Sequence, residues 1–93
     1  MTANGDDKNE LDLAAFIAGS DYRKLVISGL LEDAKQPSDL ADEGDAARSH
    51  VSRALSELRE RNLVREHGGG TRAKLYSLTD LGRRVAEHIS FDK

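Results

Sequence analysis

The strongest signal in the chain is a short helix followed by a tight turn and a longer helix, and residues 36–64 hold it. Pro37 suits a first helical position, where its missing N–H would have no partner in any case. Gly44 and Asp45 favour a turn and end this first helix. A second helix is predicted over about 47–61, because its apolar side chains recur at spacings of four and three: Val51, Leu55 and Leu58. This pattern predicts a helix-turn-helix.

The outward face of the second helix has two different halves. At about 100° per residue, its first half directs hydroxyls, an imidazole and arginines outward or to the flanks. These are the candidate binding residues: Arg48, Ser49, His50, Ser52, Arg53 and Ser56. The second half carries the acids Glu57 and Glu60. A helix that inserts its N-terminal half into a DNA major groove has this polarity, and Arg53 could bond both acceptors of a guanine. The alternative is a solvated face in which Arg53 pairs with Glu57.

A β-hairpin is predicted after this helix. Asn62 suits the left-handed residue that ends a helix, and strand-like residues follow it. Three glycines over 68–70 separate them from a second strand-like run. In the segment 68–74, Arg72 and Lys74 are candidate contacts to phosphates or the minor groove, because glycine lets the backbone approach closely. The alternative is a flexible turn with two solubilising charges.

The remaining segments predict further helices. Residues 1–9 are polar and predict a disordered leader, and residues 10–93 predict a single domain. A short helix ends at Gly19, and Ser20 or Asp21 caps a longer one that is buried on more than one side. A last helix begins after a capping Thr79-Asp80 pair. The fold class is therefore mainly α with a small β-hairpin (α+β).

Charge is segregated along the 93 residues, although the formal net charge is only −3. Residues 1–47 hold 4 basic and 11 acidic side chains, a net of −7, whereas residues 48–84 hold 9 basic and 4 acidic ones, a net of +5. Binding depends on the local potential of one face, so the basic half can still meet a polyanion. Without cysteines or an apolar run of about 18 residues, we expect a cytoplasmic protein with no disulfide and no membrane contact.

Together these segments resemble the winged helix-turn-helix domains of bacterial and archaeal transcription regulators of the MarR-like and ArsR-like groups. The resemblance covers roughly residues 11–90, and four stretches carry it: Leu40-Ala41, Arg48–Leu55, Leu63–Arg65 and Leu75–Gly82. It implies sequence-specific binding of double-stranded DNA, with the helix 47–61 as recognition helix in the major groove and the hairpin 68–74 as wing. One departure is the turn, where small or polar residues replace the family's bulky aliphatic side chain, so a looser turn is expected: Gly44, Asp45 and Ala46.

Apolar stripes on the first and last helices predict a homodimer, because regulators of this kind read paired half-sites. The stripes are Leu13, Phe16 and Ile17, and Leu81, Val85 and Ile89. Alternatively, they pack on the helix-turn-helix of their own chain. The alternative function is a winged-helix interaction module, whose acidic half binds a basic protein.

An enzyme, a metal site and a cofactor are not expected. Ser49 and His50 are adjacent on a helix and do not face each other, so they form no nucleophile–base pair. The three histidines lie on different predicted elements, without cysteine and without a helical pair spaced by four.

Overall fold

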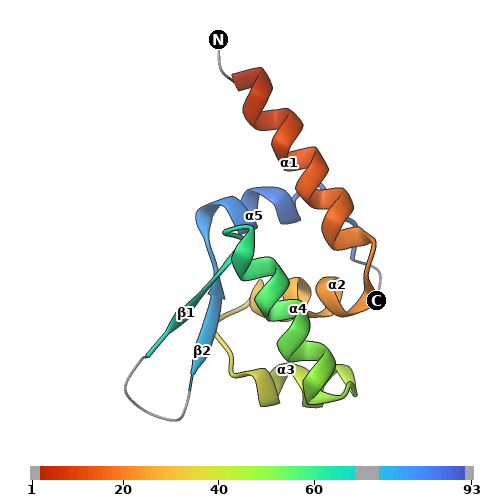
Figure 1. The fold of residues 1–93 in the computed structure, drawn as a ribbon, viewed down its shortest axis with the longest axis vertical. Coiled ribbons are helices and arrows are strands. Elements are labelled where there is room, and N and C mark those ends of the chain that lie inside the picture. The colour runs from red at the N-terminus through yellow and green to blue at the C-terminus, as the bar shows by residue number, and fades with distance from the viewer. Residues whose placement is uncertain (1–2, 69–73, 92–93) are drawn as a thin grey trace.

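The computed structural model describes residues 3–68 and 74–91, with side chains from residue 9 onwards. Over these residues it contains five helices and a two-stranded antiparallel hairpin (Figure 1). The elements are α1 (Ala3–Ala18), α2 (Asp21–Leu30), α3 (Pro37–Gly44), α4 (Arg48–Glu60), β1 (Val64–His67), β2 (Leu75–Leu78) and α5 (Asp80–Ala86). The predicted fold class, mainly α with a small hairpin, is confirmed. No helix within the described ranges has the length and apolar character that crossing a membrane requires.

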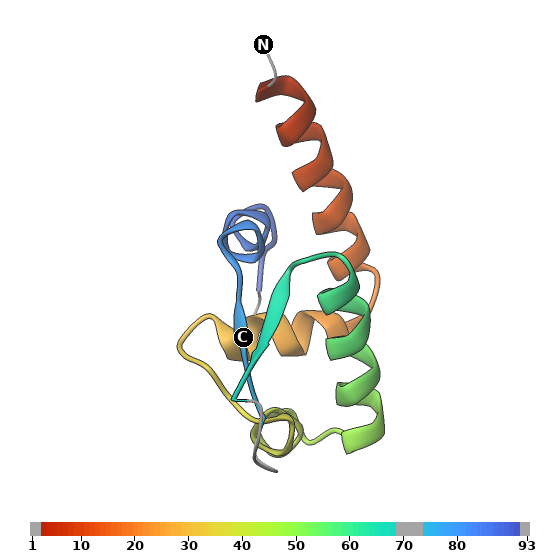
Figure 2. The same cartoon turned by 60° about the vertical axis from the view of Figure 1, so that its left-hand side comes forward.

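Helix α1 begins earlier than the sequence predicted. It starts at Ala3, within the segment 1–9 predicted to be a disordered leader, and ends at Ala18 as expected before Gly19. Residues 3–9 contain no proline, so a helix anchored by its buried C-terminal half can extend through them without the cost of nucleating a new helix. The N-terminal half of α1 projects beyond the other elements in both views (Figure 2).

Helix α2 is the central helix of the core. Its N-cap is Ser20, whose hydroxyl accepts the backbone N–H of Arg23 at 3.3 Å. Burial on two sides is confirmed for Ile27, which is fully buried, but Leu31, predicted on the same line, is 39 % exposed. Tyr22, predicted to be part of the apolar stripe, lies at the surface and is 38 % exposed.

The turn between α3 and α4 is well bonded, which corrects the expectation of a loose turn. Asp45 adopts the left-handed conformation with φ of 52°. The N–H of Ala46 donates to the carbonyl of Ala41 at 2.9 Å, as in a Schellman motif. Leu25 of α2 fills the space beside Gly44, where a Cβ would overlap its Cδ1 atom. The bulky side chain missing from the turn is therefore supplied by another helix.

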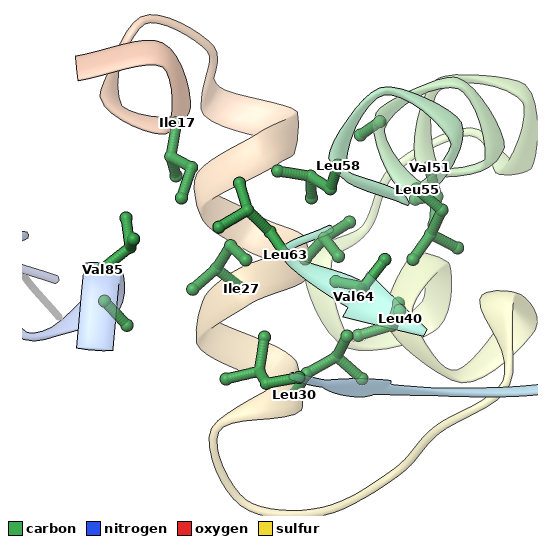
Figure 3. Close-up of a cluster of buried hydrophobic side chains, with 14 of the residues drawn as sticks. Ile17, Ile27, Leu30, Leu40, Val51, Leu55, Leu58, Leu63, Val64 and Val85 are labelled. Atoms are coloured by element: carbon green, nitrogen blue, oxygen red, sulfur yellow. The ribbon is translucent and has the colours of Figure 1, made fainter. Parts of the chain in front are cut away.

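Side chains from α1, α2, α3, α4, β1 and α5 meet in one core (Figure 3). The predicted inward residues of α4 are all confirmed as buried: Val51, Leu55 and Leu58. Ile17 of α1 and Val85 of α5 also lie in this core, and neither is accessible to solvent. The stripes predicted for a dimer are thus partly used within the chain itself.

Backbone hydrogen bonds hold the hairpin along both edges of β2. Val64 pairs with Leu78 and His67 with Leu75 along β1 and β2. On its other edge, Tyr76 exchanges two backbone hydrogen bonds with Lys35, at 2.8 and 3.0 Å. The segment before α3 therefore attaches the hairpin to the helix-turn-helix. Asn62, with φ of 62°, ends α4 in the left-handed conformation that the sequence predicted.

A polar cluster joins α1 to α5. The carboxylate of Glu10, whose side chain is 11 % exposed, accepts a hydrogen bond from Arg84 Nε at 2.9 Å and lies 3.2 Å from His88 Nε2. The hydrogen bond from Arg84, and then that with His88, lowers the pKa of Glu10. Glu10 therefore stabilises the contact between the first and last helices as an anion.

The stability of the chain is expected to depend on Glu10 in acid. A carboxyl whose pKa is lower in the folded state stabilises the fold above its unfolded-state pKa, and loses that contribution as the pH falls through the folded-state value. Glu10→Gln should therefore lower the melting temperature at pH 7 and flatten its fall on acidification below pH 4.5, the ordinary pKa of a glutamate. Thermal unfolding of both proteins across this range checks it, and parallel curves would contradict it.

Candidate nucleic-acid interface

The outward face of α4 is exposed along its length. All six residues predicted to bind through this helix are accessible to solvent: Arg48, Ser49, His50, Ser52, Arg53 and Ser56. The opposite face carries the core residues, so the helical spacing places the candidates outward as expected. No described residue forms an ion pair with Arg48 or Arg53, and both guanidinium groups are open to a ligand.

One flank of α4 is engaged by α1 and α2. His50, Glu57 and Arg61 lie on this flank, because each is seven or four residues from the next. The ring of His50 stacks on Tyr22, with ring centroids 4.5 Å apart and an interplanar angle of 8°. The guanidinium of Arg61 lies 3.8 Å from the centre of the Phe16 ring. This flank is therefore held by neighbouring helices, whereas the rest of the outward face is open.

The partner of Glu57 is Arg23 rather than the predicted Arg53. Arg23 Nε donates to Glu57 at 2.9 Å, and its Nη1 atom donates to the carbonyl of Phe16 at 2.8 Å. This hydrogen bond from Arg23 is the main reason why the pKa of Glu57 is lowered, and the charge of Arg53 adds to it. The alternative prediction, in which Arg53 pairs with Glu57 on a solvated helix face, is therefore wrong about the partner of Glu57. Arg23 instead neutralises Glu57, the acid one turn beyond Arg53 on α4.

The opposite flank of α4 faces the hairpin. Glu66 of β1 pairs with Arg59 at 2.8 Å and with Lys74 at 3.3 Å. The Lys74 ammonium is exposed, but Lys74 and Arg59 share the single carboxylate of Glu66. The three groups together therefore carry one net positive charge. Arg72, the other candidate of the wing, lies outside the described residues.

Comparison with known proteins decides the family. The model of the HVO_A0261 N-terminal domain matches residues 11–91. The chain belongs to this family. No curated protein matches the chain.

Solved structures similar to this family member are winged-helix proteins. A cysteine-to-serine mutant of Lactococcus lactis ZitR in complex with DNA has a TM-score of 0.66 and 23 % identity, over 73 % of this chain and 48 % of that one. The adhesin competence repressor AdcR of Streptococcus pyogenes has a TM-score of 0.70 and 16 % identity, over 95 % and 70 %. A mutant of the plasmid segregation protein TubR has a TM-score of 0.73 and 19 % identity, over 84 % and 85 %.

These likenesses confirm the winged helix-turn-helix fold, which the sequence predicted. The chain spans about half the length of several of the ZitR structures it matches.

In this HVO_A0261 N-terminal domain, sequence reasoning missed the part played by α2. Tyr22 contacts His50 of α4 and Arg23 contacts Glu57 of α4. These partners lie 28 and 34 positions away in the sequence, and no local pattern signals such pairs.

The histidines lie apart from one another: His67 shares a hydrogen bond with Ser77, and His88 contacts Glu10. Among the described residues, no three potential metal ligands lie close enough to hold an ion.

Proposed function

We propose that this chain binds double-stranded DNA as a sequence-specific transcription regulator in the cytoplasm, with α4 as its recognition helix. The observation that carries the proposal is the open face of α4, where two arginines with no ion-pair partner among the described residues stand among short hydroxyl side chains. Arg53 points most directly outward and would bond a guanine edge, while Arg48, in the first turn, would meet a phosphate. Ser49, Ser52 and Ser56 would contact base edges or the backbone between them.

The hairpin would contact the DNA beside the recognition helix. Its base is held against the helix-turn-helix by the bridge between Lys35 and Tyr76, so the wing starts from a defined position. Lys74, and Arg72 from the part of the wing beyond the described residues, would contact phosphates or enter the minor groove. The single net positive charge of the group formed by Arg59, Glu66 and Lys74 favours contact with an anionic backbone.

We also propose that two copies bind together through α1 and α5. The dimer is supported by Leu11 of α1, a large apolar side chain that is 55 % exposed in the single chain. A two-fold dimer would present two recognition helices to half-sites about one helical turn apart. The ZitR structure in complex with DNA has the same fold, which supports the proposed binding of DNA.

Selection of bound sequences from a random duplex pool tests the proposal. We expect enrichment of a palindromic site, and an affinity that falls as salt rises, with a log–log slope of about −0.9 for each phosphate contact. Failure to retain any duplex at low salt would contradict DNA binding. If a basic protein partner were then bound with one-to-one stoichiometry, the chain would be an interaction module. Enrichment of a site without two-fold symmetry would contradict the dimer alone.

A further inference from the structure

The stack between Tyr22 and His50 links the first turn of α2 to the first turn of α4. The two rings are nearly parallel, at 8°, with centroids 4.5 Å apart. Both residues are exposed, so the pair lies at the surface and not in the core. Offset stacking at this separation is a favourable geometry for aromatic rings, and it restricts the side-chain rotation of both.

The polar edge of the His50 ring is open. Among the described residues, no group forms a hydrogen bond with either of its ring nitrogens. Stacking therefore holds one face of the imidazole and leaves its nitrogens for an external partner. The pair lines a surface pocket together with Arg53, Arg23 and Glu57, and the Glu57 carboxylate is already bonded to Arg23. An anion that enters this pocket can therefore contact both His50 and Arg53.

The position of His50 on α4 decides what that partner would be. His50 lies on the flank towards α2, about 100° from the core-facing direction of Val51 and about 60° from the outward direction of Arg53. When Arg53 faces the floor of a major groove, a flank residue faces the groove wall, where the phosphates run. The basic half of the chain favours the same anionic contact.

We infer that Tyr22 is a positioning residue for DNA binding, which acts by holding the His50 ring ready to contact a backbone phosphate. The inference rests on the proposed function and deepens it, since the sequence pattern alone left His50 open to base edges or phosphates. A side chain that is already ordered loses less entropy when it binds. Removing the stack should therefore weaken binding without removing the contacting group itself.

The test measures affinity for the selected duplex and for a scrambled duplex by fluorescence anisotropy. Tyr22→Ala should raise both dissociation constants by the same factor, roughly two- to tenfold, as expected for one side chain that must be ordered on binding. Tyr22→Phe keeps the ring and should restore the wild-type values. In a His50→Ala background, Tyr22→Ala should have no further effect. An upfield ring-current shift of the His50 ring protons should be present in the wild type and lost in Tyr22→Ala.

Leu31→Ala is the matched control, because Leu31 is as exposed as Tyr22 but lies at the other end of α2. It should leave both affinities unchanged. Wild-type protein that binds no duplex would overturn the proposed function and this inference together. If wild type binds, three results would overturn the inference alone: an unchanged affinity in Tyr22→Ala, an equal loss in the His50→Ala background, or failure of phenylalanine to restore binding. A loss confined to the selected duplex would instead assign His50 to a base edge.

Discussion

Replacing Gly82 by alanine is expected to lower the free energy of unfolding by about 1–3 kcal/mol. Gly82 lies in the first turn of α5, where its N–H donates to the capping hydroxyl of Thr79 at 2.9 Å. That hydroxyl donates to the carbonyl of Asn62 at 2.6 Å. A Cβ at residue 82 would overlap the carbonyl oxygen of Leu63, which is backbone and cannot rotate away. Either α5 or the end of α4 must move, and the cap is strained with it.

Chemical denaturation measures this effect, and thermal unfolding should show a fall of roughly 4–8 °C for each kcal/mol. The control is Gly19→Ala, because a Cβ at residue 19 would meet its nearest neighbour, the Ala15 carbonyl oxygen, at an ordinary 3.4 Å. That variant should gain about 0.4–1 kcal/mol, since alanine restricts the unfolded chain. Equal stability of the Gly82→Ala protein and the wild type would contradict the close approach of α5 to Leu63.

Local signals in the sequence were sufficient for most of the fold. Capping residues, proline and left-handed residues act through bonds to their own neighbours, so Ser20, Pro37 and Asn62 marked element ends correctly. The burial of α4 followed in the same way from its helical spacing. The start of α1 was misplaced because helix extension depends on a folded anchor further along the chain, which composition does not reveal.

Contacts between distant segments could not be read from the sequence. Leu25 fills the space beside Gly44 in the turn. Arg23, and not Arg53, forms the ion pair with Glu57, and Tyr22 stacks on His50. Each depends on the crossing of α2 with another helix, which is a property of the packed core. The sequence therefore predicted which residues of α4 are exposed on the candidate face. Only the structure shows which of these side chains already have a partner within the chain.

Arg53→Ala is expected to weaken binding to the selected duplex by about 1–3 kcal/mol, which is roughly 5- to 150-fold in affinity. Arg53 lies on the outward side of α4, and Glu57, the carboxylate that could have neutralised it, is bonded to Arg23. A guanidinium in this position can donate two hydrogen bonds to one guanine, and alanine would leave the base acceptors without a partner. The loss should therefore fall mainly on the specific site.

Affinities for the selected and a scrambled duplex, measured at the same salt concentration, separate base recognition from a loss of charge. Arg48→Ala is the matched variant on the same helix: as a phosphate contact, it should weaken both duplexes alike and reduce the salt slope by about one. Arg83→Ala removes an exposed charge from α5 and should change neither affinity strongly. If Arg53→Ala weakened both duplexes equally, Arg53 would be a phosphate contact, and base recognition would have to come from the serines of α4.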